Sequence, residues 1–209
     1  MKRCFSMIAA LALLVSLSAC KSAPSSEEEF PVLPEFLLLD EDIQMGMKEG
    51  DVVELYGDGT RSELSGNISS MRHYTTLSGT YYSDEQPMFI QYVPAYGFTK
   101  ENALTVCMYQ YNLESLSGSA VGAFLEDVEA MLTQTYGEPT TKGEKWFDTT
   151  YQDDPGMLKQ AIADGHYQRV TLWQTDAMTI VFNVKNEYVV YTDNENEIGA
   201  AMAEAARLS

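Results

Sequence analysis

The sequence has little histidine and no recognisable catalytic motif. His73 and His166 are its two histidines, neither lies in a zinc-protease motif, and two imidazoles without a cysteine pair make a poor zinc site. Ser119 lies between Gly118 and Gly122, but the segment does not match a nucleophile elbow and is better interpreted as a helix N-cap. Phosphate-loop spacing is also absent. We therefore expect no cofactor, no metal and no enzymatic activity.

Basic residues are also scarce. The chain has 13 lysines and arginines against 31 acidic residues, a formal net charge of −18. Such a charge repels nucleic acid and anionic lipid headgroups. If the charge selects partners, they are basic proteins or cations. The alternative is that it only keeps the chain soluble.

The sequence lacks any apolar run long enough to span a bilayer, which takes about 20 residues. The longest run, Met7 to Leu17, follows the cationic Lys2 and Arg3 and precedes small residues. These are the three parts of an export signal. We expect residues 1–19 to be removed, which leaves 11 basic residues and a net charge of about −20.

The signal ends at Leu17-Ser18-Ala19-Cys20, which resembles the lipobox of bacterial lipoproteins. The resemblance implies that the Cys20 thiol receives a diacylglycerol and that cleavage makes Cys20 the N-terminus. Each buried acyl methylene contributes about 0.8 kcal/mol, so two or more chains hold a protein firmly. We expect an extracytoplasmic protein anchored in the cell membrane or outer membrane. The alternative is an ordinary secretory signal that ends near Ala19, without lipid.

The cysteines exclude a disulfide framework. Cys4 leaves with the signal and Cys20 is acylated, so Cys107 has no partner in the chain. Cys107 lies in an alternating apolar run, where a buried thiol behaves as a small hydrophobe.

Helical spacing predicts a body of mixed α+β class after a linker. Residues 20–35 are polar and punctuated by proline, which indicates a flexible linker behind the lipid. Apolar spacing predicts helices over Ile43–Tyr56, over Ser119–Tyr136 with its acidic side in water, and over Glu195–Leu208. An added helical segment begins near Pro155 and stops at Gly165.

Tyrosine, threonine and valine are concentrated in short segments that Gly, Asp or Pro separates, a pattern typical of antiparallel strands. The predicted strands are 71–77, 80–83, 88–93 and 104–112 in the first half, and 145–148, 167–175, 178–185 and 188–192 in the second.

The two halves contain a similar pattern at a separation of 80 positions. The first two predicted helices end in Tyr56-Gly57 and Tyr136-Gly137, each followed by an acid and, two positions later, a threonine. Met45 and Val52 match Leu125 and Leu132 at the same offset. We interpret this as a degenerate internal duplication, with one helix-plus-sheet repeat at 36–115 and a second at 116–209 that includes the C-terminal helix.

The arrangement resembles the small lipoproteins related to the β-lactamase inhibitory protein and to the small outer-membrane assembly lipoprotein. The resemblance covers about residues 36–192 and depends on Asp127-Val128 through Tyr136-Gly137-Glu138-Pro139, with Trp146 soon after, and on a weaker copy ending at Tyr56-Gly57. It implies a protein-binding or assembly module without catalysis, by analogy of fold alone. The glycine-rich first helix, the segment around Pro155 and the C-terminal helix depart from the pattern, so no inhibitory residue is carried over.

Three acidic clusters leave two other functions open. Residues 40–42, 153–154 and 193–197 offer oxygen atoms to calcium, but none has the glycine and terminal glutamate of a calcium loop, and solvated turns explain them as well. Paired carboxylates of a cell-envelope hydrolase acting on glycans would be formed in space and would leave no trace in sequence.

Tyrosine-rich strands supply the candidate binding face. Tyr92, Tyr109 and Trp173 represent it, because aromatic residues with a polar end are favoured at protein interfaces and one face of an antiparallel sheet can be exposed. The alternative is that tyrosine is simply a good strand former. We expect the partner to be an envelope protein or peptide, and the membrane to be contacted through Cys20 alone.

Overall fold

A computed structural model describes residues 33–83 and 86–194, all of which lie in one compact unit. The predicted signal, Cys20 and the helix predicted over Glu195–Leu208 lie outside the described residues.

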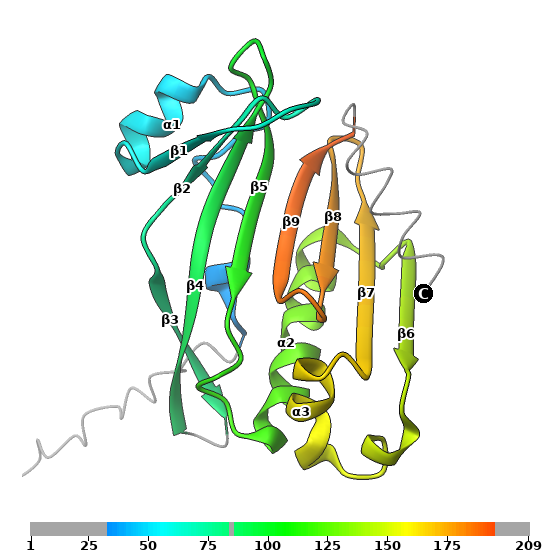
Figure 1. Cartoon of the computed structure of the whole chain (residues 1–209). Coiled ribbons are helices and arrows are strands. Elements are labelled where there is room, and N and C mark those ends of the chain that lie inside the picture. Colours follow the sequence, from blue (N-terminus) through cyan, green and yellow to red (C-terminus); the bar gives the residue numbers. More distant parts are fainter. Residues whose placement is uncertain (1–32, 84–85, 195–209) are drawn as a thin grey trace, which may run out of the picture. The chain divides into compact units, whose positions relative to one another are not determined.

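The described residues form one nine-stranded antiparallel sheet (Figure 1). Its path is β1-β2-β4-β5-β9-β8-β7-β6, and β3 pairs with β4 off this path. The prediction of a mixed fold with an antiparallel sheet is confirmed. The strands are β1 Thr60–Glu63, β2 Ser70–His73, β3 Leu77–Ser83, β4 Gln86–Phe98, β5 Leu104–Tyr111, β6 Thr141–Trp146, β7 Tyr167–Gln174, β8 Met178–Asn183 and β9 Tyr188–Asp193.

Among the described residues there are three α-helices: α1 Glu49–Tyr56, α2 Gly118–Tyr136 and α3 Leu158–Ala163. Short 3-10 turns occur at η1 Glu35–Leu37, η2 Thr149–Tyr151 and η3 Pro155–Met157. The long helix α2 lies against one face of the sheet (Figure 1). Its apolar stripe shares one buried cluster with inward side chains of β4, β5 and β7 to β9.

The start of α2 differs from the prediction. Ser117, not Ser119, caps the helix: its backbone is extended, and its Oγ accepts a hydrogen bond from the Ala120 N–H at 3.4 Å. The helix therefore begins at Gly118. An N-cap must be extended while the next residues turn, and Ser117 meets that condition.

The prediction of a helix from Ile43 is wrong for its first six residues. Gly46 has φ +87° and donates its N–H to the Leu104 carbonyl at 2.7 Å, and Lys48 forms a bridge with Ala103. These contacts tie the segment to the β4–β5 hairpin. The helix α1 can begin only after them, at Glu49.

The acidic side of α2 is not all in water, contrary to the prediction. Glu129 pairs with Arg169 of β7, whose side chain is 3% exposed, and with Lys142 at 2.5 Å. Glu126 pairs with Arg169 at 2.6 Å. The helix is therefore fastened to the sheet by ion pairs as well as by its apolar stripe.

The remaining predicted elements are partly right. The segment around Pro155 folds as expected, with Asp154 capping η3 and Ala161 and Ile162 of α3 buried. The strand predicted at 145–148 instead occupies Thr141–Trp146, and the polar strand β1 has no apolar pattern that would have revealed it.

Candidate functional site

The edge strand beside β4 is interrupted at its middle. β2 pairs with β4 as far as His73 opposite Ala95, and β3 resumes the pairing at Leu77 opposite Tyr92. The cause is Pro94, which accepts a hydrogen bond from the Tyr74 N–H at 3.0 Å but has no N–H to donate on that side. The chain from Tyr74 to residue 76 leaves the ladder there.

A half-open pocket of about 380 Å³ lies at this interruption. It lies between the sheet and the entry segment, which we define as residues 35–40. The entry segment contributes Glu35, Phe36, Leu38, Leu39 and Asp40, and Leu77 is 44% exposed. Most of the wall is aromatic and comes from Phe36, Tyr56, Tyr74, Tyr92, Tyr96 and Tyr109.

The aromatic rings of the pocket hold one another in place. Tyr56 stacks on Tyr96 with ring centroids 5.5 Å apart, and Tyr74 meets Tyr96 edge-on at the same distance. Phe36 stacks on Tyr92 at 5.3 Å, and Tyr92 lies 6.2 Å from Tyr109. Such pairs contribute about 0.5–1.5 kcal/mol each beyond burial. The aromatic wall is therefore held in its geometry by contacts within the chain itself.

The entry segment contacts the sheet at two strands, β9 and β3. The Tyr191 hydroxyl of β9 donates to the Leu37 carbonyl at 2.8 Å, and both residues are fully buried. On β3, a Cβ at Gly79 would collide with the Phe36 ring. Only a glycine at position 79 lets the Phe36 ring approach the strand this closely.

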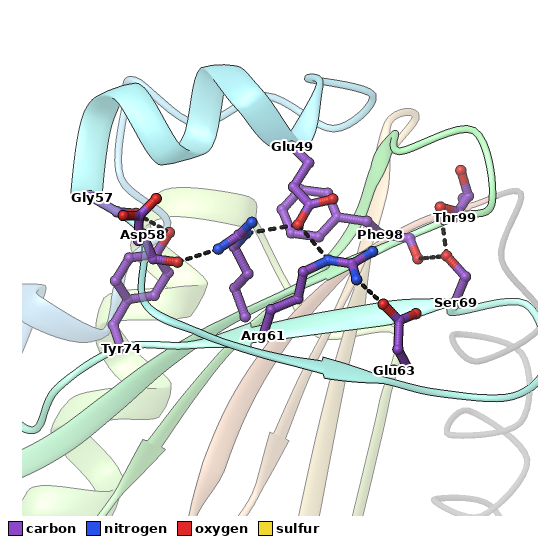
Figure 2. Close-up of polar contacts among 10 residues, drawn as sticks. Glu49, Gly57, Asp58, Arg61, Glu63, Ser69, Tyr74, Phe98 and Thr99 are labelled. Carbon is purple, nitrogen blue, oxygen red and sulfur yellow. Dashed lines mark hydrogen bonds and ion pairs between the residues drawn. The ribbon is translucent and has the colours of Figure 1, made fainter.

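An ion-pair network at Glu49, drawn in Figure 2, holds the first turn of α1. Tyr56 is the last residue of this helix. Glu49 Oε1 accepts from Arg61 Nε at 2.9 Å and from Arg72 Nε at 2.7 Å, which joins the first turn of α1 to β1 and β2. At the other end of α1 the Tyr74 hydroxyl donates to the Gly57 carbonyl at 3.1 Å, a contact that Figure 2 also shows. Tyr56 and Tyr74 are thus fixed relative to each other from two elements.

The pocket phenols are neutral at physiological pH. Burial raises the pKa of Tyr56, Tyr74, Tyr92, Tyr96 and Tyr109 above its ordinary value of 10. The Asp40 carboxylate further raises the pKa of Tyr56 and of Tyr92. These side chains therefore offer hydroxyl donors and ring faces, and they do not act as bases near pH 7.

The three residues of the candidate face have different surroundings. Tyr92 and Tyr109 both line the pocket, but Tyr109 is 5% exposed and Trp173 is fully buried in the same cluster as Val128 and Leu132 of α2. Trp173 is therefore a core residue, and its place in an exposed face was wrong. All three side chains lie on the helix-covered side of the sheet. Trp173 pairs with Ile180, and both belong to the main buried cluster. Tyr109 belongs to the same cluster, and Tyr92 packs against it.

Sequence reasoning missed Phe36, Tyr56 and Asp40 as pocket residues. They lie far apart in the chain and meet only through the fold. An available signal was Pro94, directly after the strand predicted at 88–93, because a proline in or beside a strand marks a break in pairing.

The other candidate groups stay apart. His166 stacks on Tyr151 with centroids 5.2 Å apart, whereas His73 lies half-buried in β2. Within residues 33–83 and 86–194, no three His, Cys, Asp or Glu side chains are arranged to hold a metal ion. Cys107 is a buried free thiol whose pKa is raised by burial.

Models of known protein families, curated proteins and solved structures gave no match to this chain. Among the described residues, no helix has both the length and the apolar character needed to cross a membrane.

Proposed function

We propose that this chain is an extracytoplasmic protein-binding module without catalytic activity, held at the cell membrane or outer membrane by a lipid on Cys20. Its binding site is the tyrosine-lined pocket at the strand interruption, which receives part of an envelope protein or peptide. The observation that carries the proposal is the pocket itself.

The size and lining of the pocket support binding. Sites for small ligands measure about 300–1,000 Å³ and combine apolar and aromatic walls with a few polar groups. At about 380 Å³ the pocket lies at the small end of that range, which suits one side chain of a partner. Tyrosine is also enriched among the residues that contribute most to protein interfaces.

The neutral phenols support a binding role over catalysis. A general base is most effective when its pKa is near the working pH. Tyr96 and Tyr109, which line the pocket, have pKa values raised away from neutrality by burial.

We further propose that the fold consists of two tandem helix-plus-sheet repeats, as in the group that the sequence resembles. The sheet order supports this, because β5 and β9, the last strand of each half, pair at the centre. The glycines after α1 and α2 have nearly the same angles, φ +84° and ψ −175° at Gly57 and φ +87° and ψ −171° at Gly137. The offset of 80 positions, however, carries β4 onto β7, whereas the sheet order makes β8 its counterpart.

A matched pair of variants tests the binding site. Leu77 at the pocket and Leu64 away from it are 44% and 46% exposed, so Leu77→Arg and Leu64→Arg introduce the same side chain at similar surface positions. We expect an envelope protein captured by the native chain to be lost from Leu77→Arg and kept by Leu64→Arg. Equal capture by both variants, with both folded by circular dichroism, would exclude the pocket.

The anchor is tested separately. The native chain is expected to incorporate a labelled fatty acid and to enter the detergent phase on phase separation, because acyl chains bury many methylenes. Cys20→Ser is expected to do neither. Incorporation of label by Cys20→Ser would refute lipidation at this position.

A further inference from the structure

The pocket has an acidic rim that forms no ion pair with the described residues. Glu35 and Asp40 are the charged residues among those lining the pocket, and both are exposed. In the part of the chain that the structure describes, neither forms an ion pair. Asp40 Oδ1 accepts a hydrogen bond from the neighbouring Asp42 N–H at 3.0 Å, and the Asp40 carboxylate also interacts with the neutral Tyr56 hydroxyl, so its charge stays unpaired among the described residues.

Three cations around α1 have other partners among the described residues. Arg61 and Arg72 both pair with Glu49 at the far end of α1, and Lys48 donates to the Glu101 carbonyl at 3.3 Å. The carboxylates of Glu35 and Asp40 are therefore available to pair with a group of a ligand. A cation is favoured there and an anion is repelled, in keeping with the net charge of −18.

The walls suit a cation that has an apolar stem. A neutral aromatic ring presents a negative face, and a guanidinium or ammonium group within about 6 Å of the ring centre is attracted to it. Lysine and arginine also bury their methylene stems against apolar surface while the charged head stays in water. Leu38, Leu39 and Leu77 offer that surface next to the rings.

We propose that the pocket binds a lysine or arginine side chain of the partner protein, with the stem against the aromatic wall and the charged head at Asp40 and Glu35. The proposal rests on the proposed function and names the chemistry that the site recognises. The small volume of the pocket fits one side chain rather than a folded segment, so the partner presents its basic residue on an exposed loop or an extended peptide.

The test compares two peptides of nearly the same size and shape, of which only one carries a positive charge on its side chain. An acetylated, amidated Gly-Arg-Gly peptide is titrated into the purified chain and followed by nuclear magnetic resonance at the Leu77 and Tyr92 amides. The control peptide carries citrulline, which has the size and shape of arginine without the charge. We expect the citrulline peptide to bind at least about tenfold more weakly.

Matched protein variants locate the charge effect. The double variant Glu35→Gln and Asp40→Asn is expected to weaken arginine-peptide binding by about fivefold or more, and added salt should weaken the native interaction. Asp42→Asn removes an equally exposed carboxylate that does not line the pocket, and we expect less than a twofold change. Leu77→Arg should abolish binding because its own side chain occupies the site.

The outcomes separate this inference from the proposed function. Equal binding of the arginine and citrulline peptides, or no change in the double variant, would overturn the cation assignment even if Leu77→Arg still prevents partner capture. Tetramethylammonium binding more tightly than the peptide would overturn the assignment to a partner side chain. Loss of partner capture by Leu64→Arg as well as Leu77→Arg would count against the proposed function instead.

Discussion

Replacing Tyr191 with phenylalanine removes a single oxygen atom from the core and tests how the entry segment is held. The Tyr191 hydroxyl donates to the Leu37 carbonyl at 2.8 Å, and no other hydrogen bond to that carbonyl comes from the described residues. Leu37 is fully buried, so water cannot replace the lost donor. Leaving a buried acceptor unsatisfied costs about 1–3 kcal/mol of unfolding free energy.

Tyr111 supplies the matched control. Its side chain is 2% exposed and its hydroxyl has no hydrogen-bond partner within residues 33–83 and 86–194, so Tyr111→Phe removes the same atom without breaking a bond seen there. We expect Tyr111→Phe to be neutral or to stabilise the fold by up to about 1 kcal/mol. The ring contact of Tyr111 with Phe124, at 5.7 Å, is kept in the variant.

Urea unfolding at pH 7, followed by circular dichroism, measures the difference. With a slope of about 2 kcal/mol per molar urea, a gap of about 2 kcal/mol separates the two midpoints by about 1 M. Tyr191→Phe should also weaken binding at the pocket, because Leu37 lies within the entry segment. Equal midpoints for the two variants, with equal slopes, would refute the role assigned to this hydrogen bond.

Three further substitutions probe the contacts of α2. Burial alone would raise the pKa of Glu129, but its hydrogen bonds and charge interactions with Lys142 and Arg169 outweigh burial and lower it. The stabilisation is therefore complete above the ordinary glutamate pKa and is lost as the pH falls. Glu129→Gln should lower the free energy of unfolding by about 3 kcal/mol at pH 7. In urea unfolding, the difference in this free energy between the native chain and the variant should shrink below about pH 4.5. A difference that does not change with pH would contradict this. Gly118→Ala should lower the free energy of unfolding by about 1–3 kcal/mol, because the new Cβ would collide with the Gly156 backbone carbonyl. Gly122→Ala makes only ordinary contacts and should raise the free energy of unfolding by up to about 1 kcal/mol. Thermal melts of both glycine variants decide this point, and equal melting temperatures would count against a close approach at Gly118.

The sequence was informative where one physical signal dominated. The stripe of α2, from Val121 to Leu132, has helical spacing throughout, and its six buried residues face the core. Strands rich in Val and Tyr, such as β5 and β9, were also located to within one or two residues. Burial enforces such patterns, so they can be seen without the fold.

The sequence was uninformative where contacts between distant segments decide the structure. The polar strand β1 is held at the sheet edge by Arg61, and α1 is shortened by contacts of Gly46 with Leu104. Alternation also could not identify an exposed face on β7, because Leu172 on one side and Trp173 on the other are both buried. The pocket is assembled from positions between 35 and 109, and no local pattern reports that assembly.

The antiparallel pairing of β5 with β9 determines when the sheet can be completed during synthesis. Pairs such as Met108 with Val190 join residues about 80 positions apart, so β5 has an unpaired edge until the last described strand has emerged. An open edge of this kind is a template for pairing with other chains, and contacts this distant in sequence form slowly. The nascent first half thus exposes this edge until the last described strand forms, and we expect a holding chaperone to act before that point rather than after it.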